Sequence, residues 1–130
     1  MKYLKIFEVY NPDNLRETLD DIFLDIKDDG FEYNIGGYLE KPKEDIFIPG
    51  MRMHVLSITI WKYPTWKYDE IENTISHIGS FLLENEYKLK LISIVGIRLG
   101  SIKQLKMMLQ QVEVRDRLTI EFSRIIRNQF

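Results

Sequence analysis

The chain has no cysteine and no long apolar run. Without thiols it forms neither disulfides nor thiolate zinc sites, and a reducing compartment is the default, so we expect a cytoplasmic protein. No stretch approaches the ~20 apolar residues that cross a bilayer. The first residues also lack the apolar core of a signal peptide. The sequence therefore predicts no membrane partner.

Motifs that carry chemistry are also scarce. The chain has only two histidines, His54 and His77. A zinc or iron site needs three or four converging ligands, and neither histidine has another ligand at a clear spacing beside it. No glycine-rich loop follows a strand in the pattern that cradles phosphates. The sequence predicts no catalytic residue, no metal site and no cofactor.

The length and the charge distribution carry more information. A chain of 130 residues fits a single domain, residues 1–130. The net charge of −2 hides an asymmetry, because residues 1–87 hold 9 Lys and Arg against 17 Asp and Glu, whereas residues 88–130 hold 9 against 3. The asymmetry indicates either a polar partner surface or two ends that neutralise each other within the fold.

The periodicity of apolar residues predicts alternating strands and helices. The longest strand is 52–63, which has no Gly or Pro and many β-branched residues. Before it, the pattern predicts a strand over 3–10, a helix from Pro12 to Gly30 and a strand over 31–35 that Gly36 and Gly37 weaken. After it, the pattern predicts a helix whose apolar stripe is Tyr68, Ile71, Ile75, Ile78 and Leu82, and then a strand over 88–99. A helix over 102–111 and a strand over 112–126 with a bend near Arg115 complete the chain order.

This order predicts an α+β fold with a mainly antiparallel sheet and helices on one face. Its first six elements match the ferredoxin-like βαββαβ plan, with strands 3–10 and 52–63 in the centre. The extra C-terminal helix and strand are expected to extend the sheet at one edge. A more distorted α+β sandwich is the main alternative.

Aromatic residues stand out on the face that the helices leave uncovered. If Leu56, Ile58 and Ile60 face the helices, then the odd-numbered residues of the long strand lie on the other side. Such a surface fits a covering partner, and the loop over 46–48 is apolar enough to take part. The candidate partner-binding residues are Tyr3, Phe7, Ile46, Phe47, Trp61, Tyr63 and Trp66.

A nucleic-acid-binding function is the first alternative. Aromatic residues on central strands stack bases in RNA-recognition motifs, although the long strand lacks the glycine-aromatic consensus of those proteins. Phosphate contacts would need the basic residues of the C-terminal third. The candidate basic patch consists of Arg98, Lys103, Lys106, Arg115, Arg117, Arg124 and Arg127.

Carboxylates crowd the first helix, where Asp21, Asp25 and Asp28 share one face. A solvated helix face explains them, but a contact with a basic partner stays open because the helix dipole disfavours acids near a C-terminus. A small-ligand sensor or an enzyme of unknown chemistry is a further alternative, since this class of fold hosts many functions.

The sequence is short, cysteine-free and rich in Lys, Ile, Asn and Asp, and in this composition it resembles small bacteriophage or low-GC bacterial proteins. The resemblance implies a bacterial or phage-infected cell and assigns no residue roles. With spare apolar surface and no chemical site, the sequence favours a non-enzymatic protein–protein interaction or assembly module, such as a small phage-type accessory or structural protein acting as a homo-oligomer.

Overall fold

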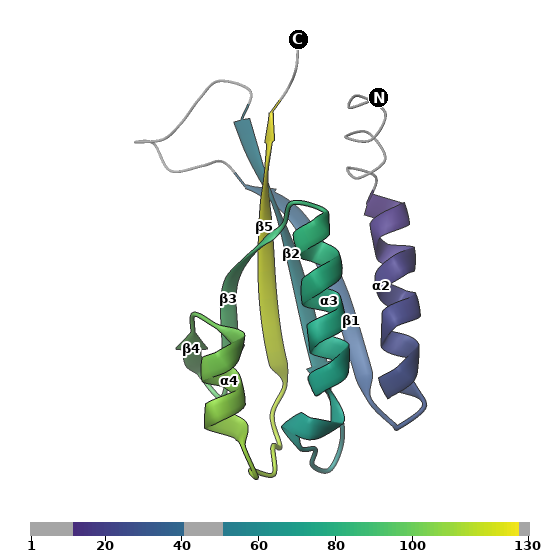
Figure 1. The fold of residues 1–130 in the computed structure, drawn as a ribbon, viewed down its shortest axis with the longest axis vertical. Helices are drawn as coiled ribbons and strands as arrows, with labels where there is room; N and C mark the ends of the chain where they lie inside the picture. Colours follow the sequence, from purple (N-terminus) through teal and green to yellow (C-terminus); the bar gives the residue numbers. More distant parts are fainter. Residues whose placement is uncertain (1–11, 41–50, 128–130) are drawn as a thin grey trace.

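The computed structural model describes residues 12–40 and 51–127 of the chain. Figure 1 shows one sheet with the helices in front of it. Within the described residues the elements are α2 (Pro12–Lys27), β1 (Glu32–Glu40), β2 (Met51–Trp61), the 3-10 turn η2 (Tyr68–Glu70), α3 (Glu72–Glu84), β3 (Lys88–Ile94), β4 (Ile97–Leu99), α4 (Ile102–Leu109) and β5 (Leu118–Arg127).

The five strands form one open sheet in the order β1-β2-β5-β3-β4. Every neighbouring pair is antiparallel. The predicted α+β class with an antiparallel sheet is therefore confirmed. The predicted long strand is also confirmed, because β2 runs over 51–61 and lies inside the sheet.

All three helices pack on the same face of the sheet. The main core joins apolar residues of α2, α3 and α4, such as Leu19, Ile78 and Leu105, to strand residues such as Ile58 and Ile120. The helices lie in front of the strands in Figure 1, with α2 toward β1 and α4 toward β4. The other face of the sheet has no helix over it among the described residues, as the sequence led us to expect.

The position of the last strand corrects the predicted topology. β5 was expected at an edge, but it lies in the centre and pairs with both β2 and β3. The prediction gave the central place to a strand over 3–10, and those residues lie outside the described part of the chain. A central place suits β5, because Leu118, Ile120 and Phe122 are all buried on its helix-covered side.

The predicted single strand over 88–99 is a hairpin of β3 and β4. Val95 and Gly96 form its two-residue turn, and both have positive φ, 53° and 76°. Turns of this kind match the twist of paired strands. Ile94 pairs with Ile97 across this turn, so even-numbered residues of β3 share a face with odd-numbered residues of β4, and the alternation expected for one continuous strand is shifted by one residue. Gly96 was the one residue in this stretch that indicated a turn between two strands.

β1 likewise extends past the glycines that were expected to weaken it. It runs to Glu40 and pairs with β2 along its whole length. Helix starts follow their sequence signals more closely. The Ser101 hydroxyl caps α4 by accepting a hydrogen bond from the backbone amide of Gln104 at 3.2 Å, and a Ser followed three residues later by a Gln is the spacing of a capping box.

Candidate functional site

Strand pairing sorts the sheet residues onto two faces. Ile58 pairs with Ile120, and both belong to the core under the helices. Val55 lies on the opposite face, where its neighbours across the ladder are Tyr38 and Ser123. Val55 has no exposed surface, yet it is not part of the helix-covered core. We call this second surface the open face.

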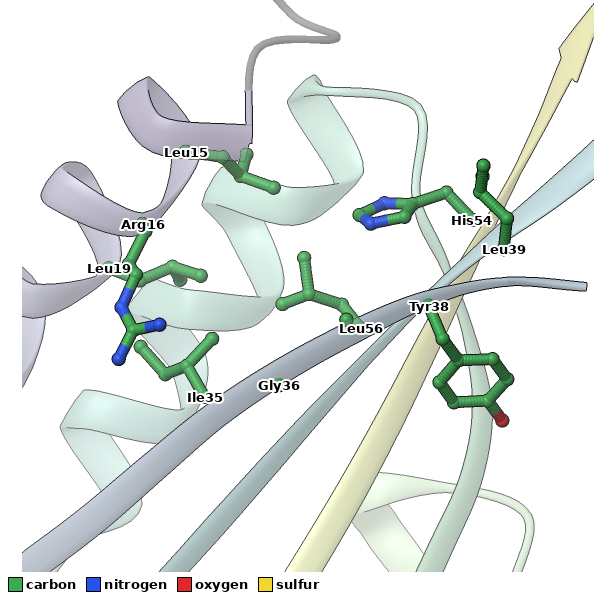
Figure 2. Close-up of a pocket in the computed structure, with 10 residues that line it drawn as sticks. Leu15, Arg16, Leu19, Ile35, Gly36, Tyr38, Leu39, His54 and Leu56 are labelled. Atoms are coloured by element: carbon green, nitrogen blue, oxygen red, sulfur yellow. The ribbon is translucent and has the colours of Figure 1, made fainter.

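One end of the open face carries an apolar patch. Met53 pairs with Ile125, next to the row that contains Tyr38 and Val55. Two of these side chains meet solvent, because Tyr38 is 47% exposed and Ile125 is 56% exposed. Figure 2 shows Tyr38 projecting from the side of the strands opposite to Leu56 and His54. We refer to Tyr38, Met53, Val55 and Ile125 as the apolar patch.

Short hydroxyl side chains lie in the middle of the open face. Thr59 and Thr119 pair across β2 and β5, and their hydroxyl oxygens lie 3.1 Å apart in a hydrogen bond. Ser57 pairs with Glu121 in the next row, so one carboxylate stands near the middle of the face. This region is flat and polar, and it contrasts with the apolar patch beside it.

The two aromatic residues at the other end of the open face, Trp61 and Tyr63, differ in their exposure to solvent. Trp61 is partly buried, and the guanidinium carbon of Arg117 lies 4.2 Å from the centre of its ring. A cation over the ring occupies the surface that a stacked base would need. Tyr63 lies just past the end of β2 and is 66% exposed. The described residues thus give the predicted base-stacking function little support.

Trp66 requires a correction. It was a candidate for partner binding, but it is a core residue that is only 1% exposed. Its ring packs edge-on against Phe31 at 6.1 Å, and its indole nitrogen donates to the Asp116 carbonyl at 3.1 Å. Its backbone also pairs with Val114. The Trp66 ring is therefore part of the hydrophobic core and is not presented to a partner.

Four of the other candidate partner-binding residues, Tyr3, Phe7, Ile46 and Phe47, lie outside the described residues, so their role stays a prediction. Conversely, two exposed members of the apolar patch, Tyr38 and Ile125, were missed. The signal for Tyr38 was present, since it continues the alternation of β1 past Gly36 and Gly37. That signal was discounted because paired glycines usually weaken a strand.

The candidate basic residues do not form one surface. Arg124 is buried and donates to Glu86 at 2.8 Å, and Lys106 pairs with Glu72 at 2.6 Å. Arg117 lies over Trp61. Arg98, Lys103 and Arg115 are exposed around β4, α4 and the approach to β5, whereas the side chain of Arg127 lies outside what the structure describes. Arg124 in particular is corrected to an interior residue.

The fold places the charge asymmetry across the sheet. Residues 12–40, which form α2 and β1, hold 2 Lys and Arg against 9 Asp and Glu. Residues 88–117, which include β3, β4 and α4, hold 7 against 2. These segments lie at opposite edges of the sheet. The most acidic and most basic segments therefore lie apart, although the ion pairs Lys106–Glu72 and Arg124–Glu86 do join the acidic residues 1–87 to the basic residues 88–130.

A small apolar cleft lies on the helix-covered side, between α2 and strands β1 and β2 (Figure 2). Its volume is about 290 Å³. Most of its surface is apolar, and its lining residues include Leu15, Leu19, Ile35, Leu39 and Leu56. Two groups at its boundary can form polar contacts with a ligand, Arg16 and His54.

A cluster of ionisable groups lies behind the cleft. Nδ1 of His54 forms a short hydrogen bond with the hydroxyl of Tyr87, which is itself buried. Burial lowers the pKa of His54, and the positive charge of Arg124 lowers it further. His54 is therefore neutral at pH 7. This cluster is a structured polar centre, but it contains no nucleophile that would define a reaction.

Among the described residues, no group of three or more His, Cys, Asp or Glu side chains is placed to hold a metal ion. None of the helices in these residues has the length and apolar character needed to cross a membrane. No protein-family model, curated protein or solved structure matches the chain. The functional argument therefore rests on the geometry of the open face and of the cleft.

Proposed function

We propose that the protein is an assembly module that binds a second copy of itself through the open face. The observation that carries the proposal is the apolar patch, in which Tyr38 and Ile125 stand exposed on a sheet surface that no helix of the described residues covers. Antiparallel sheets can leave one face to solvent, but the residues that point to that face are usually polar. Exposed apolar groups that adjoin one another favour a covering partner.

The size of the open face supports a modest interface. Five strands spaced ~4.8 Å apart and about eight residues long on average, at ~3.3 Å per residue, span on the order of 600 Å². Standard interfaces bury roughly 800 Å² on each partner. The open face is smaller than that, which is the size class of weak, transient interfaces.

The patch also selects the orientation of the second copy. All four of its residues lie at the same end of the sheet, near the start of β2 and the end of β5. A two-fold axis parallel to the strands brings the two patches together and lays β1 of one copy over the β3–β4 edge of the other. A two-fold axis across the strands would instead place each patch over the polar end of its partner.

Charge favours the same orientation. On the open face Glu32 lies on β1 and Arg98 lies on β4 at the opposite edge, in the next row of the strand ladder, and both are exposed. The axis parallel to the strands places acidic β1 over the basic edge of the partner. The axis across the strands places β1 over β1, with like charges facing. Complementary potentials select the first arrangement and suppress the second.

Sedimentation velocity across a concentration series tests the proposal. The wild-type protein should shift from monomer to dimer as its concentration rises. Ile125→Glu and Tyr38→Glu should each hold the protein as a monomer, because a carboxylate would be buried against an apolar partner. Leu24→Glu is the matched control, because Leu24 is 52% exposed but lies on α2. It should dimerise like the wild type.

Two results would overturn the proposal. One is a wild-type protein that stays monomeric at the highest attainable concentration. The other is a dimer that Leu24→Glu weakens as much as Ile125→Glu does. Circular dichroism of each variant shows whether it has kept its fold, and only folded variants enter the comparison.

A further inference from the structure

The cleft beside α2 exists because one position in β1 has no side chain. Gly37 lies on the helix-covered side, opposite Leu56 in the strand ladder and between Ile35 and Leu39. A Cβ built at Gly37 would lie 3.0 Å from Nε2 of His54. Any larger residue would push the imidazole aside and fill the space. Gly37 thus keeps both the cleft and the His54 ring position open.

The polar end of the cleft has one free hydrogen-bonding atom. Nδ1 of His54 is taken by Tyr87, which leaves Nε2 on the side of Gly37 and the cleft. When the phenol of Tyr87 donates to Nδ1, Nε2 of the neutral ring carries the hydrogen and can donate into the cleft. In Figure 2 the imidazole lies on the same side of the strands as Leu15 and Leu56.

A buried positive charge stands next to this histidine. Arg124 is opposite His54 in the strand ladder and is 7% exposed. One of its terminal nitrogens binds Glu86, but Nε and Nη1 are buried and have no hydrogen-bond partner. Glu86 is itself largely exposed, so its carboxylate is well solvated. The guanidinium is therefore only partly compensated and makes the His54 end of the cleft attractive to an anion.

We propose that the cleft binds a small aliphatic carboxylic acid, with its chain along Leu15, Leu19 and Leu56 and its carboxylate at Nε2 of His54. A cavity of about 290 Å³ lies at the lower limit for small-molecule sites, which fits a short unbranched chain. Mostly apolar walls with one convergent polar group are the usual composition of such sites. The site lies on the covered side of the sheet and does not depend on self-association.

Octanoate is the probe, with octanol as its neutral counterpart, and binding is followed by calorimetry and by the NMR signal of the His54 ring. Octanoate should bind at least about tenfold more tightly than octanol, because its carboxylate accepts a charge-assisted hydrogen bond and is attracted by Arg124, whereas the octanol hydroxyl accepts only a neutral hydrogen bond. The His54 signal should move on binding octanoate. The His77 signal should not move, because His77 lies exposed on α3 away from the cleft.

Two glycine variants form a matched pair. Gly37→Ala should weaken octanoate binding by about tenfold or more, because its methyl group takes space that the ligand and His54 need. Gly36→Ala should bind like the wild type: Gly36 also borders the cleft, but it pairs with Ser57, so its Cβ points to the open face, where it meets no atom within 4 Å. Both positions lack a positive φ, so both variants should fold, which thermal unfolding will check.

Three results would overturn the inference. Octanol could bind as well as octanoate, the two alanine variants could bind equally, or Arg16→Gln could abolish binding while His54→Gln left it unchanged. The last result would move the carboxylate to the rim, away from the imidazole. Sedimentation of the wild type is a separate measurement, so failure here leaves the proposed self-association standing and the reverse also holds.

Discussion

The two faces of the sheet consist of alternate residues of the same strands, but only one of them packs under the described helices. On β2, Ile58 and Ile60 are buried under helices, whereas Ser57 and Thr59 face outward and are partly exposed. Val55 breaks the simple rule, because it is fully buried although no helix of the described residues covers its face. The difference shows that burial alone does not reveal which face holds the fold together.

The largest expected effect separates these two kinds of burial. Ile58→Ala should lower the free energy of unfolding by about 2–5 kcal/mol, because it leaves a cavity in the core under the helices. Val55→Ala removes two methyl-sized groups from a residue outside that core, and it should cost about 1–2 kcal/mol. Urea unfolding of dilute, monomeric protein measures both values. Equal losses would contradict a distinction between the faces.

A smaller effect is expected from the one carboxylate in the middle of the open face. The two-fold arrangement brings Glu121 toward Glu121 of the second copy, and like charges at an interface oppose association. Glu121→Gln should therefore tighten the dimer by about 5–10-fold, close to 1 kcal/mol. Glu84→Gln on the exposed end of α3 is the control and should leave the dissociation constant unchanged. A weaker dimer in Glu121→Gln would place the contact elsewhere.

The covered face carries a pH dependence that the open face should lack. The pKa of His54 is lower in the folded protein than in the unfolded chain, so the unfolded chain binds a proton more readily. Stability should therefore fall as the pH drops from about 7.5 to about 5.5, through the range of an ordinary imidazole. His54→Gln should flatten this decline. Equilibrium unfolding at several pH values measures it.

The control for that experiment is His77→Gln, which changes an exposed histidine on α3 and leaves His54 in place. It should keep the wild-type dependence on pH. If His54→Gln were to lose stability over this range as steeply as the wild type, the interior position of the His54 cluster would be contradicted.

Much of the architecture could be predicted from the sequence because it depends on local patterns. The stripe of α2, including Leu19 and Phe23, and the uninterrupted run of β2 each determine a buried face without help from distant residues. The capping pair of Ser101 and Gln104 is equally local. These features agree with the structure because each element had to bury one side.

The features that sequence patterns missed depend on contacts between distant residues. The central place of β5 follows from its pairing with β2 and β3, which no periodicity encodes. Trp66 reads as a surface anchor beside Pro64, but its burial depends on Phe31 and Asp116, 35 and 50 positions away. Arg124 reads as one more surface cation, although its side chain is buried opposite His54 in the strand ladder and pairs with Glu86. The cleft was missed because its cause is the lack of a side chain at Gly37.

The self-association proposal has a direct geometric test. Asn34, Thr59, Thr119 and Ser93 form one row across the open face, from β1 to β3. A two-fold axis parallel to the strands keeps this row level, so Asn34 of one copy lies over Ser93 of the other. Because the chain has no cysteine, Asn34→Cys and Ser93→Cys each accept a single nitroxide label.

Double electron–electron resonance on a mixture of the two labelled proteins measures the distance between copies. The expected result is a short Asn34–Ser93 distance, set by sheets packed ~10 Å apart plus the label arms, with longer distances between two Asn34 labels. A shorter distance between two Asn34 labels, or no dipolar coupling at the highest attainable concentration, would contradict the account.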